Sequence, residues 1–158
     1  MVSGFEQQAR PGALRAVLYA GLLAGALDLA YALVANGMRG IEPARIMQSI
    51  ASGLLGTRAY EHGAATATLG VVLHFLIMFV IAATWYAASR RIALLTERPI
   101  VTGLAYGVVV YVVMNFVVLP LSAFPHQLAF TPASVAVGGA AMLFCVGVPI
   151  ALVVKRFG

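Results

Sequence analysis

The segment from Ala13 to Ala35, ALRAVLYAGLLAGALDLAYALVA, decides how the rest of this chain is interpreted. It is long and apolar enough to cross a lipid bilayer, because about 20 mostly apolar residues span the hydrocarbon core. Asp28 stands in its middle, where a carboxylate is costly unless a group inside the protein pairs with it or protonates it. Asp28 is therefore a candidate functional residue.

The composition extends this interpretation to the whole chain. Of the 158 residues, 62% are hydrophobic and 9% are charged, and the mean hydropathy is +0.98. Soluble domains are about 45–50% apolar and about 25% charged. The stretches that are long enough to span a membrane lie at about 13–36, 64–88, 100–122 and 133–154. We expect an all-α membrane protein with a single four-helix transmembrane domain over residues 1–158.

The net charge of +5 does not indicate nucleic-acid binding, because the basic residues lie at the ends of the spans and form no single stripe. With the N-terminus inside, seven of the ten are cytoplasmic: Arg10, Arg15, Arg90, Arg91, Arg98, Lys155 and Arg156. Cytoplasmic loops carry an excess of Lys and Arg, so an N-in, C-in orientation is predicted. Nine Arg to one Lys, with abundant Ala and Gly, suggests a GC-rich bacterial genome.

A short amphipathic helix is expected at about 42–56, between the first two spans. Glu42-Pro43 is a good helix start, and Gly53 and Gly56 end the pattern. Ile46, Met47, Ile50 and Leu54 recur on one face, opposite Arg45, Gln48, Ser49 and Ser52. Such a pattern is typical of an interfacial helix on the outer membrane surface, and it equally fits a solvated loop helix packed on the bundle.

Loops and aromatic residues add three expectations. The loop from Ser89 to Pro99 is short, so the second and third helices should be antiparallel neighbours. Pro149 lies inside the fourth span and should kink it. The aromatic residues near the span ends are expected to anchor the protein at the membrane interfaces: Tyr19, Tyr60, Trp85, Tyr86 and Tyr106.

Helical periodicity connects the polar residues of the spans with small residues, because positions four apart share a face. The rows are Ala20, Ala24, Asp28 and Ala32, beside Gly21 and Gly25, in the first helix, Thr66, Gly70, His74 and Met78 in the second, and Gly103, Gly107, Tyr111 and Asn115 in the third. Small residues let backbones approach closely. Each intramembrane polar residue should therefore face another helix and not lipid.

Depth estimates bring these polar residues together. Asp28 lies roughly 12 Å from the outer end of its span, His74 roughly 15 Å and Asn115 roughly 9 Å. We predict a cluster of Asp28, His74, Asn115 and Tyr111 in the outer half of the bundle, with Asp28 and His74 as its main pair. A His–carboxylate pair can share a proton or build a ligand site, and it can equally be structural, with each group satisfying the other.

Metal and catalytic sites are weighed separately. The residue types that bind copper or haem iron are present in the spans as His74, Met78, Met114 and Cys145. The other histidines, His62 and His126, belong to loops, so we expect neither a metal nor another cofactor. A phosphate-binding glycine loop, paired carboxylates and a GxSxG motif are absent, so no catalytic residue is expected.

Several segments carry a resemblance. They are Gln48–Gly56 (QSIASGLLG), His74-Phe75, Ser89-Arg90-Arg91 and Met114–Ser122 (MNFVVLPLS). Through them the chain resembles a family of small bacterial four-helix inner-membrane proteins that brings no known activity with it. The positions that match the family are Asp28, Ser49–Gly56, His74, Asn115, Pro120 and Pro149. Members often carry a further histidine in the last helix, and its absence here weakens a two-histidine site.

Three functions follow as hypotheses. The favoured one is a non-enzymatic inner-membrane protein, either an accessory subunit of a larger membrane complex or a binder of a lipid or hydrophobic ligand. Its partners would be the lipid bilayer, other complex subunits or a second copy, and not nucleic acid. The alternative is a dimeric proton-coupled small-molecule transporter that uses Asp28. The third is a subunit that binds haem or copper through His74.

The orientation is testable by cysteine labelling in a background without Cys145. With N-in, C-in topology, a cysteine at Arg91 should be protected from a membrane-impermeant reagent added outside, and a cysteine at His126 should react. Labelling at Arg91 together with protection at His126 would overturn the orientation.

Overall fold

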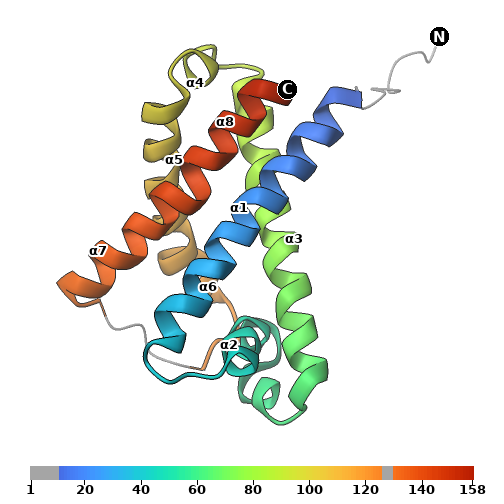
Figure 1. The fold of residues 1–158 in the computed structure, drawn as a ribbon, viewed down its shortest axis with the longest axis vertical. Helices are drawn as coiled ribbons and strands as arrows, with labels where there is room; N and C mark the ends of the chain where they lie inside the picture. The colour runs from blue at the N-terminus through green and yellow to red at the C-terminus, as the bar shows by residue number, and fades with distance from the viewer. Residues whose placement is uncertain (1–10, 126–129) are drawn as a thin grey trace.

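The computed structural model describes residues 11–125 and 130–158, and this part of the chain contains helices and no strand (Figure 1). Four helices are long and apolar enough to cross a membrane. The first two are α1 (Pro11–Gly37) and α3 (Gly63–Ser89). The third comprises α5 (Pro99–Val113), η2 (Met114–Val118) and α6 (Leu119–Leu121), and the fourth α7 (Pro132–Ala141), η3 (Met142–Gly147) and α8 (Val148–Phe157). Helices of sufficient length and hydrophobicity are thus confirmed at the four predicted positions.

Two prolines account for irregular turns in the third and fourth spans. The π-helical segments η2 and η3 each end two residues before a proline, Pro120 and Pro149 respectively. A proline ring clashes with the carbonyl group four residues earlier, and a wider π turn relieves that clash. The distortion predicted at Pro149 therefore takes the form of a π-helical segment, and Pro120 has the same effect one span earlier.

Helix α1 packs against α3 on one side and against the fourth span on the other. The predicted small-residue row makes these contacts: Ala20 and Ala24 are completely buried. Beside the row, Gly21 and Gly25 lie under the aromatic rings of Phe79 and Phe75, which occupy the space that a Cβ would need. Small residues on α1 thus let α3 approach closely.

The third span packs against the fourth through glycines. A Cβ on Gly107 would lie 2.6 Å from Leu143 Cα, and a Cβ on Gly147 would overlap the carbonyl of Gly103. At these positions the two backbones are in direct contact, which only glycine permits.

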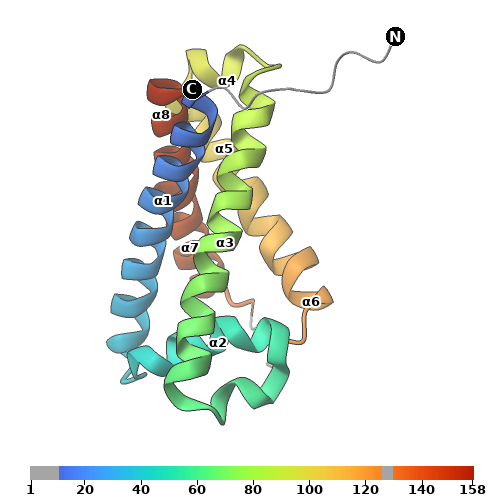
Figure 2. The ribbon, with the colours of Figure 1, turned by 90° about the vertical axis from the view of Figure 1, so that its right-hand side faces the viewer.

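Helices α3 and α5 meet only near the end of the bundle that carries α4 (Leu94–Glu97). There the Tyr106 hydroxyl donates a 2.8 Å hydrogen bond to the Ile81 carbonyl, and the rings of Tyr106 and Trp85 lie 4.8 Å apart. Toward α6 the two helices diverge (Figure 2). The two helices are thus neighbours at one end only, because the short loop between them fixes only that end of the pair.

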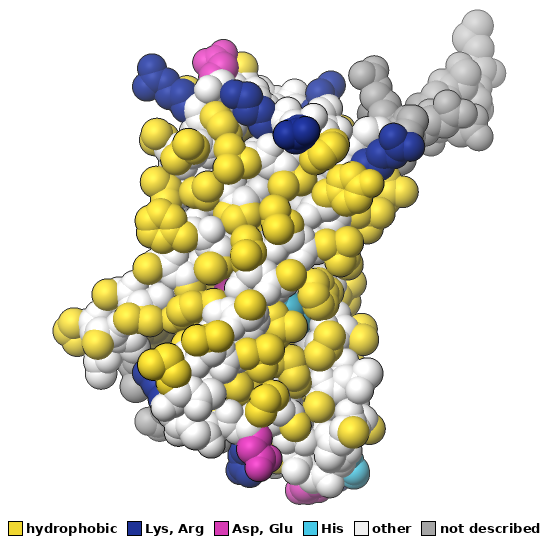
Figure 3. Space-filling model, in the orientation of Figure 1, with side chains coloured by type: hydrophobic (Ala, Val, Ile, Leu, Met, Phe, Trp, Pro, Cys, Tyr) yellow, Lys and Arg dark blue, Asp and Glu magenta, His cyan; other side chains and the backbone are white. Residues whose placement is uncertain are grey.

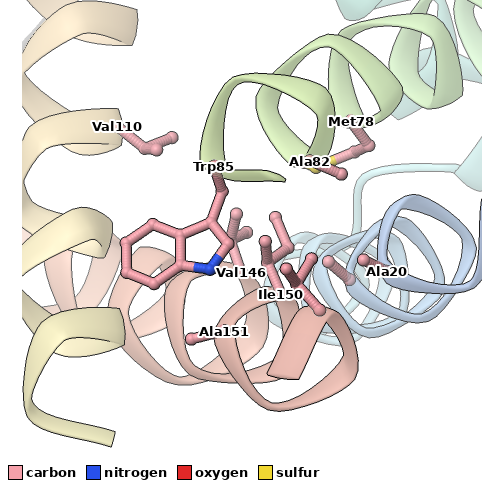
Figure 4. Packing of buried hydrophobic residues seen from close by; sticks show 10 residues of the cluster. Ala20, Met78, Ala82, Trp85, Val110, Val146, Ile150 and Ala151 are labelled. Atoms are coloured by element: carbon pink, nitrogen blue, oxygen red, sulfur yellow. The ribbon is translucent and has the colours of Figure 1, made fainter. Parts of the chain in front are cut away.

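Trp85 is a core residue, which corrects its assignment as an interface anchor. Its side chain is 3% exposed and lies between α3, α5 and the fourth span, next to Val146 and Ala151 (Figure 4). The reason is the small size of its neighbours, which leaves room for the indole inside the bundle. Tyr106 is likewise half-buried, and its hydroxyl bonds to protein and not to the membrane interface.

Helix α2 (Pro43–Leu55) covers the opposite end of the bundle and is followed by η1 (Gly56–Tyr60). It crosses α3 at Gly70, where the Met47 backbone lies in the space of a Cβ, and Gln48 Nε2 donates to the Gly63 carbonyl at 2.9 Å. Gln48 is buried and Leu54 is 63% exposed, so the predicted polar and apolar faces are partly wrong. The cause is the packing on α3, which buries polar side chains of α2. An interfacial position of α2 stays a prediction.

The glycine contact between the third and fourth spans predicts a position-dependent response to alanine. Gly147→Ala should lower the free energy of unfolding by at least about 2 kcal/mol, because its Cβ meets the Gly103 backbone. Gly139→Ala, in the same span, should change stability by less than about 1 kcal/mol, because its Cβ would meet nothing within 4 Å. Unfolding in detergent–SDS mixtures measures both, and equal losses would contradict the packing described.

Candidate functional site

The divergence of α3 and α5 leaves a cavity of about 460 Å³ in the half of the bundle nearest α2. We call it the inner cavity; its walls come from α1, α2, α3, the third span and η3. A second space of about 390 Å³, the lateral groove, runs between α3 and α5. The two share lining residues, namely Ile77, Ile81, Val110, Met114 and Val118. The inner cavity and the lateral groove are therefore adjacent, with these five residues between them.

The walls of the inner cavity are mostly apolar. Among the residues that the structure describes, the polar side chains that line it are those of Asp28, Ser49, His74 and Ser122, and Asp28 is the only charged one. A largely apolar cavity with a few convergent polar groups is the usual form of a small-molecule site. This makes the inner cavity the candidate functional site.

His74 is fixed by a hydrogen bond to the neighbouring helix. Its Nε2 lies 2.9 Å from the carbonyl oxygen of Gly25, and its side chain is buried. Because a carbonyl oxygen only accepts, Nε2 must carry the proton, and Nδ1 is left for another partner. The sequence indicated His74 as a candidate but did not indicate the Gly25 carbonyl as its partner. Gly25 lies beside the predicted row of α1, and its lack of a side chain lets α3 come close enough for the bond.

Asp28 lines the same cavity as His74 without bonding to it. The two are close enough to interact electrostatically, and Cys145 of η3 lies within electrostatic range of Asp28 as well. Within residues 11–125 and 130–158, Asp28 forms neither a hydrogen bond nor an ion pair. Its carboxylate oxygens are therefore available to a molecule in the cavity.

The other residues of the predicted cluster lie elsewhere. Asn115 and Tyr111 do not line the inner cavity. The Asn115 side chain donates a 2.8 Å hydrogen bond to the Tyr111 carbonyl, one turn earlier in the third span. The Tyr111 ring lies against Gly138 of α7, 3.4 Å from the place of a Cβ. The structure thus brings Asp28 and His74 to one cavity and leaves Asn115 and Tyr111 outside it.

Ser49 and Ser122 are site residues that sequence reasoning missed. Ser49 of α2 was assigned to a polar face turned away from the membrane, and Ser122 directly follows the third span. Their hydroxyls donate to the carbonyls of Ile46 and Leu119, each at 2.7 Å. The two serines lie in the segments Gln48–Gly56 and Met114–Ser122, which stood out in the sequence. Nothing in the sequence indicated that the two segments meet at one cavity.

The described ranges contain no group of three or more His, Cys, Asp or Glu side chains that could hold a metal ion. His126, one of the loop histidines, lies outside the described residues. In the comparisons with protein-family models, curated proteins and solved structures, no match to this chain was found. Its function is therefore argued from the cavity.

The different environments of Asp28 and His74 predict opposite responses to substitution. His74→Ala should lower the free energy of unfolding by about 1–3 kcal/mol, because the bond to Gly25 is lost and a void is left. Asp28→Asn should leave it unchanged or raise it, because no hydrogen bond is lost and a charge is removed from an apolar cavity.

Unfolding of both variants in detergent–SDS mixtures tests this difference. A loss of more than about 1 kcal/mol for Asp28→Asn would show that the carboxylate has a stabilising partner. That outcome would favour the structural Asp28–His74 pair that the sequence predicts.

Proposed function

We propose that this protein is a non-enzymatic protein of the bacterial inner membrane that binds a lipid or another hydrophobic ligand in the inner cavity. The observation that carries the proposal is that this largely apolar cavity lies directly beside the lateral groove between α3 and α5, with five residues lining both spaces. Movement of these shared side chains would let an apolar molecule pass between the bilayer and the cavity without crossing water.

The size and lining of the cavity support a small ligand. Binding sites for small molecules occupy about 300–1,000 Å³ and are lined mainly by hydrophobic side chains. The inner cavity, at about 460 Å³, falls in this range. Met78, Met114 and Met142 contribute to its walls, and methionine side chains adapt to ligands of differing shape.

The mouth of the lateral groove is suited to contact with lipid. Leu76, Val80 and Val109 line it, and more than half of each residue is exposed, at 56%, 60% and 53%. Hydrophobic side chains cover the middle of the molecule in Figure 3, and basic side chains gather at the end that carries α4 and the C-terminus. This distribution supports the N-in, C-in orientation, which places the inner cavity in the outer half of the membrane beneath α2.

An accessory role in a larger membrane complex is compatible with the same geometry, since the groove could receive part of a partner subunit. The two versions of the proposal differ in what co-purifies with the protein. A small molecule in stoichiometric amount indicates a ligand-binding protein, and a protein in stoichiometric amount indicates a complex subunit.

A second candidate is proton-coupled transport, and one observation favours it. Asp28 lines the cavity without a hydrogen-bond partner, as a group that binds and releases protons would. Transport differs from binding in requiring release on both sides of the membrane. Uptake into proteoliposomes that depends on a proton gradient and on Asp28 would distinguish transport from binding.

Filling the cavity provides the direct test of ligand binding. The double variant Ile77→Phe/Met114→Phe adds two rings at positions that line both spaces. The matched control Val72→Phe/Val112→Phe adds two rings on the same spans at exposed positions outside both linings. The control keeps the cavity intact.

Mass spectrometry of the solubilised protein should detect a bound hydrophobic molecule with the wild type and the control. At least about nine-tenths of it should be lost from the filled variant, because overlap with the rings costs more than about 1.4 kcal/mol. An equal amount of bound molecule in the filled variant, or none in the wild type, would contradict the proposed function.

A further inference from the structure

We propose that the ligand of the inner cavity is an amphiphile with a protonated amine, and that the Asp28 carboxylate binds this amine. The inference rests on the proposed function, because it specifies the chemical class of the molecule that the cavity receives. It follows from the charge of the lining and from the direction of the hydrogen bonds already formed there.

Charge complementarity selects a cation. Within residues 11–125 and 130–158, Asp28 is the one charged side chain of the inner cavity, and no Lys or Arg of these ranges lines the cavity or the lateral groove. A phosphate or carboxylate head group would meet a like charge in a weakly polar space, where repulsion is strong. A protonated amine would instead supply the countercharge that the Asp28 carboxylate lacks.

The remaining polar groups of the lining act as acceptors. The hydroxyls of Ser49 and Ser122 already donate to backbone carbonyls, so each can only accept from a ligand. The Ser122 oxygen also accepts from the Phe124 N–H at 3.2 Å, which leaves it one lone pair. His74 donates through Nε2 to the Gly25 carbonyl, so the neutral ring offers Nδ1 as an acceptor. An ammonium group has three donors and no acceptor, which matches this set of groups.

His74 does not replace the ligand as the countercharge. It interacts electrostatically with Asp28, but no hydrogen bond or ion pair joins the two side chains in the described part of the chain. The bond to Gly25 needs only the proton on Nε2, so it does not require a positive charge on His74.

The apolar part of the ligand has a defined path. Ile77, Val110 and Met114 line both spaces, so they lie between the region of Asp28 and the lateral groove. A chain packed on these side chains would extend from the amine at Asp28 toward the bilayer. An apolar body with a single cationic end therefore satisfies the whole site.

Three probes of equal chain length test the head group: octylamine, octanol and octanoate. At pH 7 the amine is protonated and the carboxylate is ionised. Binding is measured on the full chain in nanodiscs of phosphatidylcholine, with empty nanodiscs as the blank for partitioning into lipid. The fluorescence of Trp85 is the readout, because Trp85 is the only tryptophan and packs on Tyr106 of the lateral groove.

The wild type should bind octylamine at least about tenfold more tightly than octanol, and octanoate most weakly. Asp28→Asn should reduce the affinity for octylamine to that for octanol, while octanol binding stays unchanged. The comparison of the three probes on the wild type decides the question even if the variant does not fold.

The outcomes separate the two proposals. The first outcome is equal binding of all three probes, or tightest binding of octanoate, with binding lost in Ile77→Phe/Met114→Phe. It would overturn the proposed preference for an amine and leave the hydrophobic binding site standing. Binding of every probe that is unaffected by the filled cavity would overturn the proposed function itself.

Discussion

Close approach of backbones at small residues is the constraint on which the rest of this structure depends. In a bilayer the hydrophobic effect does not drive helices together, so association relies on van der Waals packing and interhelical hydrogen bonds. Gly107 and Gly147 join the third span to the fourth, and Ala20 and Ala24 of α1 are buried among their neighbours. The small-residue face of α3 is used elsewhere: Gly70 meets α2, and His74 meets α1. No such face of α3 is left for α5.

The open seam between α3 and α5 follows from this distribution. Trp85 and Tyr106 bridge the two helices at the α4 end. There the helices are not in backbone contact, and the Trp85 indole fills the space between them. Beyond this bridge the helices diverge, and α2 covers the end of the space that results. The helix pairs that have glycine or alanine on their facing sides pack closely. The pair α3 and α5 does not, and the cavity beside Asp28 is the consequence.

Much of this arrangement could be predicted from the sequence. Apolar length located the spans, and four-residue periodicity identified the buried row of α3 that includes His74. Periodicity defines a face but does not say which neighbour that face meets. For this reason Asn115, which shares its pattern with Asp28, was expected at the same site, whereas its helix turns it away from the cavity. Trp85 was misassigned for a related reason, since its distance from the basic loop fits an interface anchor and a core residue equally well.

Within a membrane, α3 and α5 should be held together at one end and apart at the other. Electron–electron double resonance can test it with two pairs of spin labels in nanodiscs, in a Cys145→Ala background. Thr84 and Val109 line the lateral groove near the Tyr106 bridge, and Leu76 and Val118 line it farther along. We expect a longer distance for Leu76–Val118 than for Thr84–Val109, because the helices diverge toward α6 (Figure 2). Equal distances, or a shorter one for Leu76–Val118, would mean that the helices close along their length and leave no lateral entrance.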